Sequence, residues 1–170
     1  YMNQPLVNRV AQSSLKTINL EDYFPNGDIE SFDLKDYLYM ELILKEKDFR
    51  TALSEYDWSQ YEGKNLAVHC STDAIIPVWA WMLVVTKAEP FCNQVYMGDA
   101  EAFIRQAYVK ELSQIDLDIY TDQRIVIKGC SDKPVPPSAY LELTKLLRPY
   151  AKSIMYGEPC STVPIYKKKK

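Results

Sequence analysis

Glycine and histidine are scarce in this 170-residue sequence, which has five glycines and one histidine. Low glycine content, together with 47% hydrophobic and 25% charged residues, excludes a fibrous, low-complexity or disordered chain. The length suits one domain that buries a substantial core without disulfides or a structural metal. We therefore expect an N-terminal arm at residues 1–14, a single domain at 15–166 and a basic tail at 167–170.

Positive charge is also limited, because 20 Lys and Arg residues face 23 Asp and Glu residues and leave a net charge of −3. This balance argues against a protein that binds nucleic acid through a broad basic surface. The longest apolar run, Ala74 to Val85, is too short to cross a bilayer, and no positively charged and then apolar leader begins the sequence. We expect a cytoplasmic protein with no nucleic-acid or membrane partner, and the oligomeric state stays open.

Cysteine is present in only four copies, too few for the disulfide scaffold of a secreted protein. None of the four forms the close CxxC pair of a zinc ribbon. The chain also lacks the spacing of a P-loop, a GxGxxG turn, an HExxH helix, a GxSxG elbow or an EF-hand. These absences exclude the commonest nucleotide, metalloprotease, hydrolase and calcium motifs, and they leave open whether the chain is an enzyme.

Short apolar strands alternate with helical patterns along most of the chain. Strands are predicted at residues 15–20, 29–34, 66–68, 94–97, 124–128 and 153–156. Helices are predicted at residues 39–53, 74–85, 100–108 and 137–147. The alternation predicts an α/β fold: a single three-layer domain with a mainly parallel sheet, helices on both faces and an N-terminal hairpin or strand extension. The helix from about Ala74 is apolar on nearly every side and is expected to be buried.

Three cysteines lie where predicted strands end. Cys70, Cys130 and Cys160 each stand at or just beyond the carboxyl end of a strand, and a serine follows each one. The carboxyl ends of parallel strands gather at one edge of a sheet, where ligands normally bind. The helices expected after Cys70 and Cys130 would turn their N-terminal N–H groups toward that edge and favour a thiolate. Topology could therefore line one crevice with three thiols.

The cysteine pattern supports three hypotheses. The first is a metal or iron-sulfur site formed by Cys70, Cys130 and Cys160, with zinc, iron or an iron-sulfur cluster as the candidate cofactor. The second is a thiol enzyme in which Cys70 acts as nucleophile or sulfur carrier. The third is a non-catalytic interaction module whose cysteines only pack. A fourth ligand in the first hypothesis would come from one of the neighbouring residues Asp73, Asp132, Glu158 or His69.

The single histidine stands next to a candidate thiol, but strand geometry opposes a pair between them. Neighbouring side chains on a strand point to opposite faces, so His69 and Cys70 could meet only if the strand has already broken into a turn. Cys92 precedes a predicted strand, which places it at the opposite edge of a parallel sheet. We expect Cys92 to be structural.

Four segments resemble an uncharacterised protein family of Bacteroidetes bacteria. They are residues 40–50 (MELILKEKDFR), Cys70 with residues 73–77 (DAIIP), residues 127–130 (IKGC) and residues 154–164 (IMYGEPCSTVP). The resemblance covers nearly the whole chain. The family is a domain of unknown function, so the resemblance implies no reaction and no catalytic residue. Its members are often encoded near SUF-type iron-sulfur assembly genes, which implies an accessory role in cluster assembly with assembly proteins as partners. That link is an association, not a mechanism.

Overall fold

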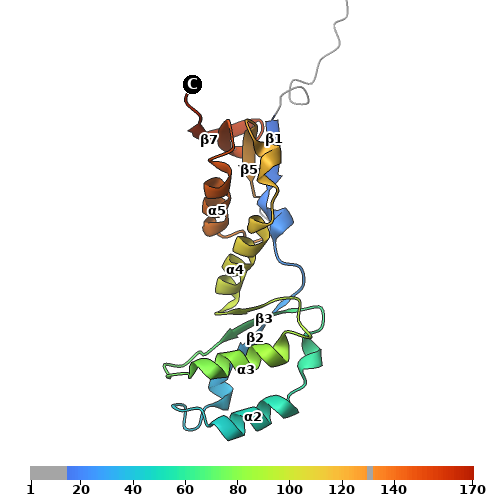
Figure 1. Ribbon diagram of the computed structural model, residues 1–170, viewed down its shortest axis with the longest axis vertical. Coiled ribbons are helices and arrows are strands. Elements are labelled where there is room, and N and C mark those ends of the chain that lie inside the picture. The colour runs from blue at the N-terminus through green and yellow to red at the C-terminus, as the bar shows by residue number, and fades with distance from the viewer. Residues whose placement is uncertain (1–14, 130–131) are drawn as a thin grey trace, which may run out of the picture. The chain divides into compact units, whose positions relative to one another are not determined.

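The computed structural model describes residues 15–129 and 132–170, which divide into two compact units. Unit 1 takes Tyr1–Phe24 and Tyr108–Lys170, and unit 2 is Pro25–Ala107. Each unit is built around a sheet of its own (Figure 1). The predicted arm at residues 1–14 lies outside the described residues, and the expectation that residues 15–166 form one domain stays a prediction.

Unit 2 contains a three-stranded parallel sheet in the order β2-β3-β4. Its elements in chain order are β2 (Ile29–Asp33), η2 (Leu34–Tyr37), α2 (Glu46–Glu55), η3 (Trp58–Tyr61), β3 (Asn65–His69), α3 (Val78–Ala88), β4 (Val95–Met97) and the first half of α4 (Ala100–Ser113). Side chains alternate along β3, so Leu66 and Val68 join a core with α2 and α3, whereas Ala67 joins Phe103 and Ala107 of α4. Helices therefore cover both faces of this sheet.

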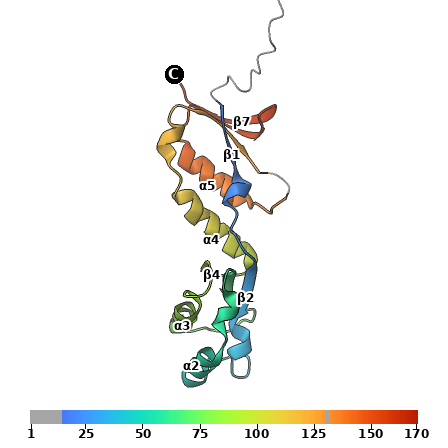
Figure 2. The same cartoon turned by 90° about the vertical axis from the view of Figure 1, so that its right-hand side faces the viewer.

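Unit 1 contains a four-stranded sheet in the order β1-β5-β6-β7. Its elements are β1 (Leu15–Asn19), η1 (Leu20–Tyr23), the end of α4, η4 (Leu117–Tyr120), β5 (Arg124–Lys128), α5 (Pro137–Leu147), β6 (Ser153–Glu158) and β7 (Ser161–Lys167). The first three strands of the sheet are parallel, and β7 returns antiparallel to β6. Figure 2 shows the hairpin strand β7 and helix α5 in this unit. Ile125 and Ile154 are fully buried in its core, as is Leu143 of α5.

The α/β fold predicted from the sequence is confirmed, and every predicted strand is present. The parallel strands form two sheets rather than the one expected. The first two strands extend these sheets as edge strands, β1 beside β5 and β2 beside β3. Local alternation predicts where strands lie but carries no signal for which strands pair, so the division into two sheets was not visible in the sequence.

Two helix predictions need correction, and one strand was not predicted. The helix predicted from Tyr39 starts only at Glu46, because Met40 and Glu41 have positive φ angles of 51° and 59° that a right-handed helix excludes. The apolar helix starts at Val78 and is not buried on every side, since Val78 is 74% and Met82 63% exposed. Residues 161–167, where no strand was predicted, form the additional strand β7. Within the described residues, no helix combines the length and apolar character needed to cross a membrane.

Candidate ligand-binding pocket

The cysteines predicted to share a crevice lie in different surroundings. Cys70 follows β3 in unit 2, where it packs half-buried against the α2 and α3 core and its Sγ–H donates to the carbonyl oxygen of Thr72 at 3.5 Å. Cys160 is exposed in unit 1, in the turn between β6 and β7. Cys130 lies outside the described residues. The three-cysteine site therefore stays a prediction, and so does the nucleophilic role of Cys70.

The acidic candidates for a fourth ligand are mostly exposed or occupied. Asp73 is exposed in unit 2, and Asp132 is exposed in unit 1. Glu158 forms an ion pair with Lys128, with 3.5 Å between Oε2 and Nζ. In residues 15–129 and 132–170, no three His, Cys, Asp or Glu side chains are grouped so that they could hold a metal ion. That finding does not extend to Cys130.

The histidine candidate is paired with an aspartate on the neighbouring strand. His69 lies opposite Asp33 in the β2–β3 register, with 3.6 Å between Nε2 and Oδ2. The other oxygen of Asp33 accepts N–H groups from Lys35 at 2.9 Å and Ser71 at 3.0 Å. Burial acts to raise the pKa of Asp33, but the hydrogen bonds from Ser71 and Lys35 and the nearby imidazole outweigh it and lower that pKa. These contacts tie the end of β2 to the segments that follow β2 and β3, and the ligand role of His69 stays a prediction.

The predicted separation of His69 and Cys70 agrees with the packing. Val68 and Cys70 both pack in the α2 and α3 core, which leaves His69 between them directed to the opposite face. Cys92 also behaves as a structural residue, because it packs against the same core and its Sγ–H donates to the carbonyl oxygen of Ala88 at 3.2 Å. Burial raises the pKa of the Cys92 thiol, which disfavours the reactive thiolate.

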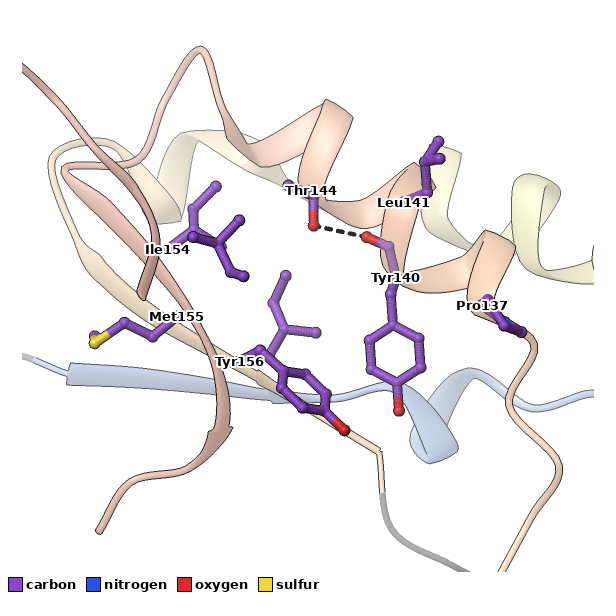
Figure 3. A pocket seen from close by; sticks show the side chains of 9 residues that line it. Pro137, Tyr140, Leu141, Thr144, Ile154, Met155 and Tyr156 are labelled. Carbon is purple, nitrogen blue, oxygen red and sulfur yellow. Dashed lines mark hydrogen bonds between the residues drawn. The ribbon is translucent and has the colours of Figure 1, made fainter. Parts of the chain in front are cut away.

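A hollow with a largely apolar lining lies elsewhere, on the α5 face of the unit 1 sheet. Its volume is about 460 Å³. Figure 3 shows the side chains that line it. Four lining residues come from α5, three from β6 and one each from β5 and β7. In that order they are Pro137, Tyr140, Leu141, Thr144, Ile154, Met155, Tyr156, Ile127 and Ile165. The polar atoms that these side chains bring are hydroxyl groups and one thioether sulfur, so the pocket offers an apolar ligand a largely apolar surface.

Helix α5 presents two different stripes of side chains. Ala139, Leu143 and Leu147 are buried at a spacing of four residues and form its core stripe. Leu141, by contrast, lines the pocket and is 68% exposed. A helix is about 10 Å wide and strands lie about 4.8 Å apart, so one helix cannot cover a face of four strands. The outer strand stays partly bare, and its pocket residue Ile165 is 53% exposed.

Two tyrosine rings form one part of the pocket wall. The rings of Tyr140 and Tyr156 meet edge to face, with centroids 5.7 Å apart and planes at 74°. Figure 3 shows the Tyr140 ring extending from α5 toward the strands, beside the ring of Tyr156. The Tyr140 hydroxyl passes so close to Gly129 that a Cβ there would lie 1.9 Å from it. Gly129 is therefore needed for this position of the ring. The Thr144 hydroxyl donates to the Tyr140 carbonyl at 2.7 Å, so it is satisfied within the helix.

This pocket was not among the sites predicted from the sequence, because those predictions rested on the cysteines at the ends of strands. Two signals were available. Pro137, Leu141 and Thr144 recur at helical spacing beside the core stripe of α5, and the apolar residues Val163 and Ile165 follow the last predicted strand. Neither signal shows by itself that the two segments face each other across a sheet.

One family is shown by comparison with known proteins. A family model described as "Protein of unknown function (DUF2480)" matches residues 4–168. The chain belongs to this family. The match confirms the resemblance to a family of unknown function noted from residues 40–50, Cys70 with 73–77, 127–130 and 154–164. The bacterial group and the SUF gene neighbourhood stay predictions, and DUF2480 brings no established reaction with it. Comparison with curated proteins and with solved structures found no match.

Proposed function

We propose that the protein binds an elongated apolar small molecule in the pocket between α5 and the strands β5, β6 and β7. The observation that carries this proposal is the pocket itself, about 460 Å³ in volume and lined mainly by apolar side chains. Small-molecule sites commonly have volumes of about 300–1,000 Å³ and mainly apolar walls. A largely apolar lining on α5 and three neighbouring strands suits an apolar chain better than a compact polar ligand.

Removal of apolar surface from water would supply the affinity. Leu141, Tyr156 and Ile165 are exposed large hydrophobic residues that line the pocket. Covering such surface contributes about 25 cal/mol per Å². The walls are also partly pre-organised, because Tyr140 is fixed between Gly129 and the edge of Tyr156. A rigid site loses less conformational entropy when a ligand binds.

Calorimetric titration of the whole chain with dodecanol tests the proposal. The dodecanol concentration stays below its solubility limit. We expect saturable binding that Leu141→Gln weakens roughly tenfold, since a leucine contact contributes about 1.5 kcal/mol or more. The matched control is Met82→Gln, which changes an exposed residue of α3 in unit 2 and should leave binding unaltered. Absence of saturable binding, or equal losses in both variants, would contradict the proposal.

We also propose, as a second candidate, the thiol site inferred from the sequence, with a role in iron-sulfur assembly in the cytoplasm. One observation favours it: β5 and β6 are paired in parallel, and Lys128 and Glu158 at their ends form an ion pair. Each of these two residues stands two positions before a cysteine, Cys130 or Cys160. Thiolates at those positions would suit zinc, iron or an iron-sulfur cluster.

Metal analysis of anaerobically purified protein tests this second candidate. We expect near-stoichiometric zinc or iron in the wild type, lost in Cys160→Ser and kept in Cys92→Ser, which alters a half-buried thiol in unit 2. Cys70→Ser shows whether the thiol of unit 2 belongs to the site. Metal-free wild-type protein, or equal loading in all variants, would sink the candidate.

A further inference from the structure

We infer that the ligand of the α5 pocket is a long-chain monocarboxylate whose carboxylate pairs with Arg148. The inference rests on the proposed function and specifies the chemistry of the ligand's polar end. It follows from the position of Arg148 on α5, from the absence of an ion-pair partner for it, and from the charge at the end of the β6–β7 hairpin.

Arg148 continues the helix side that lines the pocket. Leu141 and Thr144 line it, and Arg148 follows Thr144 by four residues at the C-cap of α5. Residues four apart on a helix are neighbours on one face, about 5–6 Å apart between Cβ atoms. The guanidinium therefore lies about one helical turn beyond the apolar residues of the pocket. The polar head group of a ligand whose chain lies along α5 would be located there.

The Arg148 side chain is held over the strand next to the pocket. Its guanidinium carbon lies 5.0 Å from the centre of the Tyr166 ring. Tyr166 is adjacent in sequence to Ile165 and lies opposite Ile154 in the β6–β7 register, and both isoleucines line the pocket. Stacking on an aromatic ring orients the guanidinium and leaves its N–H donors available to an anion.

The positive charge of Arg148 has no carboxylate partner in the described part of the chain. None of the ion pairs among residues 15–129 and 132–170 includes it. Glu142, on the same helix, pairs instead with Lys145 at 2.7 Å. An arginine fork matches the geometry of a carboxylate, with which it can form two parallel hydrogen bonds.

The surrounding charge at this end of unit 1 is also positive. Lys167 lies opposite Ser153 in the β6–β7 register, and Ser153 directly follows Lys152. The backbone N–H of Lys168 donates to the carbonyl oxygen of Lys152. Of these three lysines, Lys168 pairs with Asp122. At the other end of the hairpin, by contrast, Glu158 neutralises Lys128. The ligand is therefore oriented with its carboxylate toward Arg148 and its chain toward Tyr140 and Tyr156.

Calorimetric titration of the whole chain at neutral pH tests the inference, with dodecanoate kept below micelle formation and dodecanol kept below its solubility limit. We expect dodecanoate to bind roughly tenfold more tightly, as a charge-assisted hydrogen bond predicts. Arg148→Gln should remove this preference by weakening dodecanoate far more than dodecanol, and the dodecanol binding that remains shows that the variant is folded. Lys145→Gln, a matched loss of one cation on the same helix, should keep the preference.

Two results separate failure of the inference from failure of the proposed function. Equal binding of the acid and the alcohol by the wild type, or a preference that survives in Arg148→Gln, overturns the carboxylate assignment and leaves the apolar pocket standing. Failure of both ligands to bind the wild type overturns the pocket function, and the inference with it.

Discussion

The two sheets of this protein differ in how completely their faces are covered. In unit 2, three parallel strands lie between α2 and α3 on one face and α4 on the other. In unit 1, the antiparallel strand β7 widens the sheet to four strands, and the pocket opens where α5 meets this outer hairpin. The hairpin added to the parallel sheet of unit 1 therefore creates apolar surface that helix α5 does not cover.

Exposed apolar residues also occur in unit 2, but they have a different setting. Val78 and Met82 project from the outer side of α3, away from the stripe formed by Ala80 and Val84. Neither Val78 nor Met82 lines the α5 pocket. In unit 1, Leu141 and Ile165 lie on either side of a hollow. Concavity rather than exposure therefore distinguishes the proposed ligand site.

The largest expected effect separates the two stripes of α5. Leu143→Ala should destabilise unit 1 by about 2–5 kcal/mol, because it leaves a cavity around a fully buried side chain. Leu141→Ala, the same change two residues earlier on the exposed pocket side, should alter the free energy of unfolding by no more than about 0.5 kcal/mol. Chemical denaturation measures both. Similar losses for the two variants would show that the pocket wall is part of the core.

A smaller loss is expected where the pocket wall meets the backbone. Gly129→Ala places a methyl group against the Tyr140 hydroxyl and ring, so the Tyr140 ring must leave the position in which it meets Tyr156. We expect a cost of about 1–3 kcal/mol in denaturation. In a Tyr140→Leu background the same glycine change should cost much less. An equal cost in both backgrounds would assign the effect to the backbone at position 129 and not to the tyrosine.

The edge strand β2 of unit 2 offers a test by pH. We expect a change of about 1 kcal/mol in the free energy of unfolding. Asp33→Asn removes the carboxylate that accepts N–H groups from Lys35 and Ser71. Because folding lowers the pKa of Asp33 below its ordinary 3.8, the carboxylate stabilises the fold above that pH, and this contribution disappears as the pH falls through the folded pKa. The stability difference between wild type and variant should therefore shrink below about pH 4. A constant difference down to low pH would exclude the charge as its cause.

The smallest effects should come from one exposed ion pair in each unit. Lys64 and Glu30 are 3.4 Å apart in unit 2, and Lys128 and Glu158 are 3.5 Å apart in unit 1. Replacing either glutamate with glutamine should change the free energy of unfolding by less than about 1 kcal/mol, and added salt should reduce the change further. A clearly larger loss for Glu158→Gln alone would show that the ends of β5 and β6 depend on this pair.

The sequence predicted the strands of both sheets well and the candidate site poorly, for a physical reason. The apolar run within Arg124–Lys128 and the alternation within Ile29–Asp33 indicate local burial, and both segments are strands. Which strands pair depends on contacts between distant segments, so the separate sheets and the return of β7 were not predictable from local pattern. The pocket depends on that return, because Ile165 reaches it only through pairing of β7 with β6.

The central claim is that the partly uncovered hairpin of unit 1 forms a site for an apolar chain. Methyl-detected NMR during titration with dodecanoate tests it most directly, with Ile, Leu, Met and Val methyl groups labelled. We expect saturable chemical-shift changes for the methyl groups of Leu141, Ile154 and Ile165, which line the pocket. The methyl signals of the exposed Val78 and Met82 of α3 should stay unchanged. Unshifted pocket methyls, or equal shifts on α3, would contradict it.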